Sequence, residues 1–256
     1  VLASLLPKRS RWNMNTLLHV HLQAKFSGRK KTKPAEENNF SKQKLELLLK
    51  GLESFVQKLS LKKVKTTWDD YYTDTILGKD YLNAKTILVE SFTSEIDFAT
   101  VIDLGANDGA FSRLAANRGI YTIAADFDPY CINNLYRSIK RLAEKNIQPM
   151  IIDLANPSPA IGVNNEERSS FLSRVKTDLV MALALIHHLA IAKNIPFGMI
   201  ADLFQRTAKK YLIIEFVPKT DEKIQLMLTG KKDIYIAYTE ENFRIAFEKY
   251  FTVTKQ

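Results

Sequence analysis

The chain has 256 residues, of which 46% are hydrophobic, and it carries a formal net charge of +9. This length supports one good-sized core, or one domain with an appendage. The single cysteine, Cys131, excludes an internal disulfide and is typical of a reducing compartment, so we expect a cytoplasmic protein. The longest apolar run, residues 179–192, contains His187 and His188 and is shorter than the ~20 residues that span a bilayer, so we expect no membrane partner.

The positive charge is concentrated at the start of the chain. Residues 1–66 hold 15 Lys and Arg against four Glu. One interpretation is an arm that binds nucleic acid or an anionic surface. The interpretation that we favour is a solvated surface, or a face toward an upstream domain of the same protein, because basic runs without interleaved aromatics are weak evidence for base stacking. The sequence begins with Val1 and not with Met, and no signal peptide is visible in its first residues, so we expect a C-terminal part of a longer protein.

Residues 1–66 are predicted to form a helical appendage. A short helix is expected at residues 15–26, followed by a polar linker. Ser41 is placed to cap a second helix, whose apolar residues from Leu45 to Leu59 recur at helical spacing. We expect that face to pack against the side of the sheet that follows.

Residues 101–112 read Val-Ile-Asp-Leu-Gly-Ala-Asn-Asp-Gly-Ala-Phe-Ser, which predicts a buried strand, a tight turn and a helix. In such a unit glycines let the backbone approach a nucleotide, and the helix N-terminus directs N–H groups at it. The order Gly105-x-Asn107-x-Gly109 differs from the dinucleotide pattern, so close approach to a pyrophosphate is not provided for. Asp103, just before the turn, repels a diphosphate and favours a cationic ligand. S-adenosylmethionine, a sulfonium with an ammonium group, therefore fits better than NAD.

Acids also end two apolar runs downstream. Asp126 and Asp153 each stand at the expected carboxyl end of a strand. A carboxylate at the first position can accept both hydroxyls of a ribose, and one at the second can accept a hydrogen bond from an adenine amino group. The expected later strands cover residues 121–125, 149–152, 178–184 and 211–214.

Helices are expected between these strands. They cover residues 81–91, 109–118, 129–144, 166–174, 197–209 and 221–228. The alternation predicts an α/β fold with a doubly wound, Rossmann-like parallel sheet. We expect two parts, a basic helical appendage at residues 1–66 and a ligand-binding domain at residues 67–256. The turn-rich segment 156–165 is expected at the rim of the ligand site.

The motifs resemble those of the class I S-adenosylmethionine-dependent methyltransferases, from about Ala99 onward. Residues 103–109 resemble their first motif, and residues 124–129, Ala-Ala-Asp-Phe-Asp-Pro, resemble their ribose-binding segment. Residues 151–154, Ile-Ile-Asp-Leu, resemble the adenine-binding segment. Residues 178–189 are similar to the fourth motif of the ubiquinone and menaquinone methyltransferases. Within this fold the chain resembles a bacterial group labelled nodulation-type methyltransferases.

The resemblance implies a methyltransferase domain with S-adenosylmethionine as its cofactor. The motif positions imply cofactor contacts from Asp103, Gly105, Asn107, Gly109, Asp126, Phe127, Asp153 and Leu154. In this fold the segment before the first strand often covers the cofactor, so Tyr72, with Trp68 and Tyr71, is a further candidate. Ordinary packing of the appendage is the alternative for these aromatics. An antiparallel hairpin is also implied at the end of the sheet, of which the chain holds only the first strand, near residues 251–254.

Methyl transfer from a sulfonium is an in-line displacement, in which the enzyme mainly aligns acceptor, methyl and sulfur. A neutral hydroxyl acceptor also needs a base. His187 and His188 follow the fourth strand, where the methyl group is expected, and the ordinary histidine pKa of ~6.5 suits this role. Glu215, after the fifth strand, is a second candidate for the base or for acceptor binding. Each of the three can instead pack inward or hold a loop.

The absence of several sequence motifs restricts the chemical class of the methyl acceptor. Residues 182–185 read Ala-Leu-Ala-Leu, not the Asn/Asp-Pro-Pro-Tyr-like turn common for methylation of base nitrogens. Cys131 is expected in a helix core, away from the methyl group, and no cluster of acids predicts a metal site. We therefore expect methyl transfer to an oxygen or nitrogen of a small or medium-sized molecule. The alternatives are an RNA or polyanion methyltransferase that uses the basic arm, and a non-catalytic cofactor-binding domain.

Overall fold

The computed structural model describes residues 2–27, 41–59, 61, 79–229 and 233–256. The chain divides into two compact units, residues 1–63 and 64–256. The expected boundary between residues 66 and 67 lies outside the described residues, as do Trp68, Tyr71 and Tyr72. Within the described ranges, no helix combines the length and the apolar character needed to cross a membrane.

The first unit is helical. Its elements are Leu2–Leu5 (α1), Lys8–Trp12 (η1), Met14–Thr16 (α2), Leu17–Leu22 (η2), Gln23–Ser27 (α3) and Lys42–Lys58 (α4). The run from α2 to α3 is continuous and confirms the helix predicted at residues 15–26. Asn13 begins this run, because its side chain accepts hydrogen bonds from the N–H groups of Asn15 and Thr16.

Helix α4 begins where the sequence predicts. Ser41 Oγ accepts a hydrogen bond from the N–H of Lys44 at 3.3 Å, which satisfies one of the free donors of the first turn. The apolar residues of this helix are largely exposed, Leu45 by 44% and Leu49 by 54%. Packing of this face against the sheet therefore stays a prediction.

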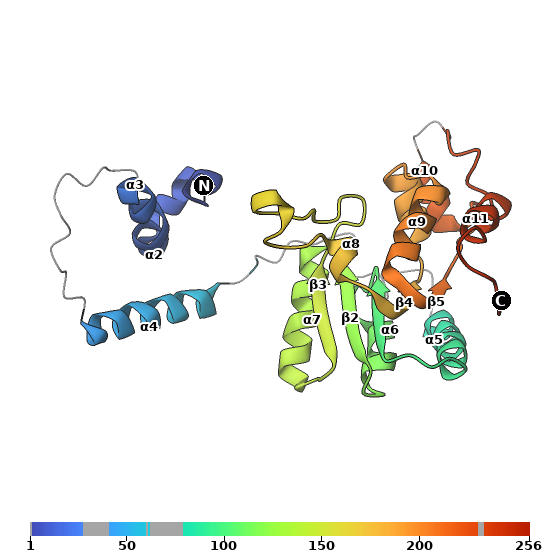
Figure 1. Cartoon of the computed structure of the whole chain (residues 1–256), viewed down its shortest axis with the longest axis horizontal. Coiled ribbons are helices and arrows are strands. Elements are labelled where there is room, and N and C mark those ends of the chain that lie inside the picture. Colours follow the sequence, from blue (N-terminus) through green and yellow to red (C-terminus); the bar gives the residue numbers. More distant parts are fainter. Residues whose placement is uncertain (1, 28–40, 60, 62–78, 230–232) are drawn as a thin grey trace. The chain divides into compact units, whose positions relative to one another are not determined.

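The second unit is built on a five-stranded parallel sheet (Figure 1). Its strands are Thr100–Leu104 (β1), Tyr121–Asp126 (β2), Ile147–Ile151 (β3), Thr177–Ala182 (β4) and Ala208–Ile214 (β5). They lie in the order β3-β2-β1-β4-β5. The doubly wound Rossmann-like prediction is thus confirmed. The order reverses between β1 and β4, and open α/β sheets bind ligands at such a point, outside the carboxyl ends of the strands.

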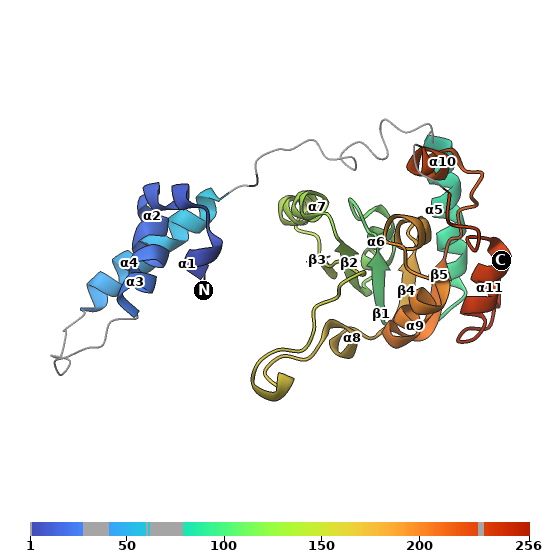
Figure 2. The ribbon, with the colours of Figure 1, turned by 90° about the horizontal axis from the view of Figure 1, so that it is seen from above.

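Helices cover both faces of this sheet. They are Lys79–Ser94 (α5), Ala110–Ala116 (α6), Pro129–Leu142 (α7), Phe171–Arg174 (α8), Phe197–Thr207 (α9), Glu222–Leu228 (α10) and Glu240–Phe247 (α11), with short turns at Val163–Asn165 (η3) and His188–Ala192 (η4). Figure 2 shows α6 and α7 on one side of the sheet and α8 and α9 on the other.

The core follows the two-residue period of the strands. Val101 and Leu179 face the layer that holds Phe111 of α6. The next residues along these strands, Ile102 and Val180, face the layer that holds Ile200 and Phe204 of α9. Because both faces are covered, most of the buried strand residues are apolar, as is typical of parallel sheets, and Asp103 and Asp126 are among the exceptions.

Two of the predicted elements were wrong. Residues 166–169 are not helical, because the N–H groups of Glu167 and Arg168 donate to the carbonyl of Ile161 in a tight reversal. Helix α8 begins only after Ser170, whose side chain accepts a hydrogen bond from the N–H of Ser173.

The expected strand near residues 251–254 is the second error. The N–H of Phe251 donates to the carbonyl of Phe247, so the chain turns at the end of α11. The tail that follows is irregular, and Lys255 forms an ion pair with Glu95, the residue after α5. Within the described residues the sheet therefore ends at β5.

Candidate functional site

A cavity of about 230 Å³ opens at the carboxyl ends of the strands. Its walls come from the start of α5, the turn after β1, the ends of β2 and β3, and the loop and turn after β4. The lining residues are Tyr81, Leu82, Lys85, Asp103, Gly105, Asn107, Phe111, Ala125, Asp126, Phe127, Cys131, Ile152, Asp153, Leu154, Leu183, Ala184, Leu185, His188, Leu189, Ala192 and Lys193. The cavity thus crosses the point where the strand order reverses.

The turn after β1 has a left-handed backbone at three positions. Gly105 and Gly109 have φ values of 79° and 80°, and Asn107 has a φ of 48°. Glycine adopts this conformation without strain, and asparagine tolerates it better than most residues. A Cβ at Gly109 would lie 2.8 Å from Leu135 Cδ1 of α7, so this position needs glycine for space as well. Gly105 and Asn107 line the cavity, whereas Gly109 does not.

Asp103 presents a buried carboxyl group to the cavity. It lies near the end of β1 and is 2% exposed. Ser112 Oγ donates a hydrogen bond to its Oδ2 at 2.6 Å. Burial raises the pKa of Asp103 to about 6, against the opposing effects of Ser112 and Lys85. Since a buried carboxylate is stabilised by a nearby positive charge, this part of the cavity favours a cationic group.

Asp126 ends β2 and is held by the backbone on both sides. Its Oδ2 accepts a hydrogen bond from the N–H of Asn107, and its Oδ1 accepts one from the N–H of Asp128, both at 2.9 Å. Burial raises the pKa of this carboxyl group above its ordinary value. Each carboxylate oxygen can accept a second hydrogen bond, so the fixed group is suited to bind ligand hydroxyls. Phe127, the next residue, is half-exposed and lines the cavity.

Asp153 and Leu154 line the cavity beyond β3, and their contact with an adenine stays a prediction. Lys193, which follows η4, also lines this end. Its Nζ lies 3.6 Å from Asp153 Oδ2 and 5.9 Å from the centre of the Phe127 ring. This end therefore combines a carboxylate acceptor with apolar and aromatic surface, which are the features that a purine site needs.

The two histidines after β4 have different surroundings. His188 lines the cavity, whereas His187 is 2% exposed and is not a lining residue. Burial is the main reason why the pKa of His187 falls to about 3 and that of His188 to about 4, and the charge of Lys223 lowers both further. Both imidazoles are thus neutral near pH 7, and only that of His188 faces the cavity.

Glu215, the third predicted catalytic residue, does not line the cavity. Its Oε2 accepts hydrogen bonds from Lys85 Nζ at 2.6 Å and from the N–H of Ala184 at 2.7 Å. Its Oε1 accepts one from the hydroxyl of Tyr81 at 3.1 Å. Glu215 therefore joins α5 to the loop after β4, and all three of its partners line the cavity.

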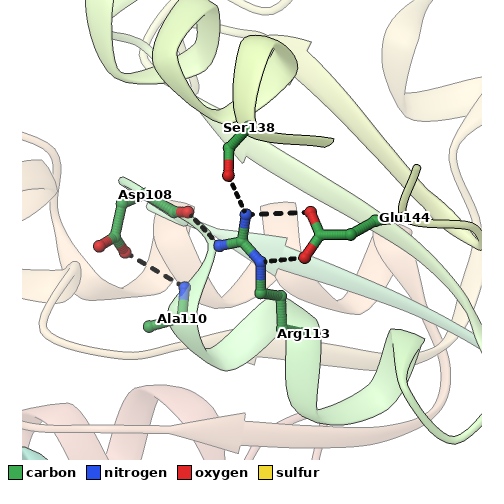
Figure 3. Close-up of polar contacts among 5 residues, drawn as sticks. All are labelled: Asp108, Ala110, Arg113, Ser138 and Glu144. Carbon is green, nitrogen blue, oxygen red and sulfur yellow. Dashed lines mark hydrogen bonds and ion pairs between the residues drawn. The ribbon is translucent and has the colours of Figure 1, made fainter. Parts of the chain in front are cut away.

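Arg113 supports the glycine turn from outside the cavity (Figure 3). Its Nε donates to Glu144 Oε1 at 2.7 Å, and its second terminal nitrogen donates to Glu144 Oε2 at 3.1 Å and to Ser138 Oγ at 3.2 Å. Its first terminal nitrogen donates to the backbone carbonyl of Asp108 at 2.7 Å. Asp108 Oδ1 in turn accepts a hydrogen bond from the N–H of Ala110, the first residue of α6.

The remaining predictions have mixed outcomes. Cys131 is buried, as expected, but it also lines the cavity. No residue of segment 156–165 belongs to the lining, so the predicted rim does not reach this cavity. In the part of the chain that the structure describes, no group of three or more His, Cys, Asp or Glu side chains could hold a metal ion.

The polar groups lie across the cavity in an order that fits S-adenosylmethionine. Asp153 at β3 suits the adenine, Asp126 at β2 suits the ribose, and Asp103 at β1 suits the ammonium group. Their order follows from the strand order β3-β2-β1. The glycine turn follows Asp103 in the chain, and the N–H of Asn107 within it donates to Asp126.

Sheet order, glycine turn and strand-end acids together give the chain the fold of the class I S-adenosylmethionine-dependent methyltransferases, which confirms the resemblance. No protein-family profile matches the chain. The chain is 33% identical to the nodulation protein NoeA of Rhizobium meliloti (strain 1021) over 254 residues, or 96% of this chain and 53% of that protein. This similarity agrees with the nodulation-type resemblance, and the chain spans about half the length of that relative.

Two solved structures are more distantly similar. Magnesium protoporphyrin IX methyltransferase (ChlM) from Synechocystis PCC 6803, with bound SAH, has a TM-score of 0.45 and 17% identity, over 83% of this chain and 85% of that one. The bifunctional kinase-methyltransferase WbdD has a TM-score of 0.45 and 16% identity, over 74% of this chain and 40% of that one.

Proposed function

We propose that the chain binds S-adenosylmethionine and transfers its methyl group to an oxygen or nitrogen of a small or medium-sized acceptor. The observation that carries the proposal is the row of three carboxyl groups, Asp103, Asp126 and Asp153, along one cavity at the carboxyl ends of β1, β2 and β3. Such a row matches the ammonium, ribose and adenine groups of one ligand, and it disfavours a diphosphate.

Each of these side chains has a separate task in the proposal. Asp126, fixed by the N–H groups of Asn107 and Asp128, accepts the ribose hydroxyls. Asp153 accepts a hydrogen bond from the adenine amino group, and Phe127 and Leu154 provide apolar contact. Gly105, Asn107 and Gly109 shape the turn that lets the backbone approach the ligand.

Bound S-adenosylmethionine supplies a methyl group that is open to in-line attack by a nucleophile. Of the three catalytic candidates, we assign the proton acceptor to His188, because it alone lines the cavity. The imidazole of His188 is neutral at pH 7 and can accept a proton, but burial lowers its pKa to about 4, so it is a weaker base than an ordinary histidine. His187, buried behind it, and Glu215, engaged with α5 and Ala184, are assigned positioning roles.

The activity is tested with S-adenosylmethionine that carries a labelled methyl group. The full chain is incubated with a small-molecule extract and, separately, with total RNA. The proposal expects label in the small-molecule fraction, lowered ~10²–10⁴-fold in His188→Gln if this residue is the base. Label in RNA alone would favour the polyanion alternative and the basic arm. Binding without any transfer would favour the non-catalytic alternative.

A further inference from the structure

Lys85 is a cation in a place where the sequence motifs predict none. It lies on α5, its side chain is only 12% exposed, and it lines the cavity. Its Nζ lies 5.2 Å from the centre of the Phe111 ring and 5.8 Å from that of Tyr81, so aromatic side chains partly enclose it. Placing a cation in such surroundings costs free energy unless anionic groups face it.

Glu215 is one such anionic group, but its hydrogen bond uses only one of the N–H donors of the Lys85 ammonium. An ammonium carries three N–H donors, and the 2.6 Å bond to Glu215 Oε2 uses one of them. The same oxygen also accepts the N–H of Ala184, which fixes the carboxylate and so directs Lys85. Glu215 is therefore placed to orient the lysine, and the remaining donors can serve a ligand.

The strand order decides which part of a ligand Lys85 meets. Lys85 and Asp103 line the same cavity, and the charge of Lys85 lowers the pKa of that carboxyl group. Glu215 further links it to Ala184, in the loop after β4. Asp153 follows β3, which is separated from β4 by β2 and β1 in the sheet. The cavity thus has an adenine end at Asp153 and an end with one acid and one base, Asp103 and Lys85.

We propose that Lys85 binds the carboxylate of an α-amino-acid group whose ammonium is bound by Asp103, and that it selects adenosyl ligands that carry such a group. The inference rests on the proposed function and deepens it, because it assigns a recognition residue outside every motif. Glu215 is then a positioning residue for Lys85, and this explains why a carboxylate at the end of β5 faces α5 and not the cavity.

Three ligands separate the contributions in a calorimetric titration. S-adenosylhomocysteine carries both the carboxylate and the ammonium, its decarboxylated analogue keeps only the ammonium, and 5′-methylthioadenosine has neither. The parent chain should bind S-adenosylhomocysteine ~10-fold or more tightly than the decarboxylated analogue, which is the usual range for a hydrogen bond to a charged group. The ratio of the affinity for S-adenosylhomocysteine to the affinity for its decarboxylated analogue is the quantity to measure in the variants.

Lys85→Met removes the charge and keeps the apolar stem, and Lys85→Arg keeps the charge. Lys85→Met should bring the ratio close to one, and Lys85→Arg should retain most of it. Because Lys85→Met leaves Glu215 without its cationic partner, Lys85→Met/Glu215→Gln serves as a second variant in which the Glu215 charge is also removed. The matched control is Lys193→Met at the adenine end, which should change the affinities for all three ligands by the same factor and leave the ratio as in the parent.

A parent-like ratio in Lys85→Met and in the double variant would overturn the inference. A parent chain that binds both ligands equally would overturn it as well, while leaving the proposed function intact. A parent chain that binds none of the three ligands would instead overturn the proposed function, and with it the assignment of Lys85.

Discussion

The guanidinium of Arg113 and the carboxylate of Glu144 are joined by two parallel hydrogen bonds, of 2.7 and 3.1 Å, although neither residue lines the cavity (Figure 3). Arg113 belongs to α6, and Glu144 follows α7. The same guanidinium holds the carbonyl of Asp108 in the glycine turn. The pair thus connects the turn to the two helices that flank it.

Arg113→Ala should therefore weaken both the fold and the cofactor site. Loss of several charge-assisted hydrogen bonds in a partly buried place should lower the free energy of unfolding by about 1.5–3 kcal/mol. The affinity for S-adenosylhomocysteine should fall as well, because the turn loses its anchor. Arg206→Ala, which breaks the exposed pair with Asp202, is the matched control and should cost at most ~0.5 kcal/mol. Equal effects of the two variants in urea unfolding would contradict this role.

Gly109 and Gly119 offer a second matched pair. Both have φ values near 80°, but a Cβ at Gly109 would meet Leu135 at 2.8 Å, whereas at Gly119 no atom lies within 4 Å. Gly119→Ala should cost only the backbone strain, ~1–2 kcal/mol. Gly109→Ala should cost about 1–3 kcal/mol more, since the core must yield. Thermal unfolding of both variants measures the difference, and equal melting temperatures would show that Leu135 moves without cost.

Ligand affinity should depend on pH through Asp103. Its pKa in the unliganded protein is raised to about 6, mainly by burial, so below pH 6 the group is mostly protonated and cannot attract an ammonium. The affinity for S-adenosylhomocysteine should fall as pH decreases from 7 to 5, by up to ~10-fold per unit below pH 6. Asp103→Asn should bind weakly at every pH. A parent affinity that is constant over this range would argue against Asp103 as the partner of the ammonium.

Stability should depend on pH through the histidines. In the unfolded chain they take up protons below their ordinary pKa of 6.5, whereas in the folded chain His187 does so only near pH 3 and His188 near pH 4. Between pH 6.5 and 4 the unfolded state therefore binds more protons, and the free energy of unfolding should fall as pH falls. Asp103 acts in the opposite sense between pH 6 and 3.8, because its folded form binds the proton first.

His187→Asn should reduce this loss in acid, and Asp103→Asn should increase it. Urea unfolding midpoints at pH 7, 6, 5 and 4 give the slopes for the parent and both variants. Parallel curves for the parent and His187→Asn would contradict a neutral, buried His187.

The strand-end acids were predictable because their signal is local. Asp103, Asp126 and Asp153 each follow an apolar run, and the carboxyl ends of parallel strands meet at one edge of the sheet. Lys85 was not predictable in this way. It is one lysine on a helix that precedes β1, and only the tertiary packing of α5 brings it to the cavity.

The two histidines show a second limit. Adjacent residues in a helical turn point about 100° apart, so at most one of them is expected to face a given wall, and spacing does not tell which. The C-terminal error has a different origin. Thr239, followed by two glutamates, is a recognisable helix start, and its side chain does cap α11. The expected strand at residues 251–254 rested on the family resemblance and not on a local pattern of residues.

The central claim is that the cavity along β1, β2 and β3 binds an adenosyl amino acid. Calorimetric titration of the full chain with S-adenosylhomocysteine, alone and with excess NAD, tests it most directly. We predict one binding site per chain, no competition by NAD, and an affinity that falls by ~1–3 kcal/mol in Asp126→Ala, where the ribose hydroxyls lose their acceptor. Absence of binding, or displacement of the ligand by NAD, would contradict the assignment of the site.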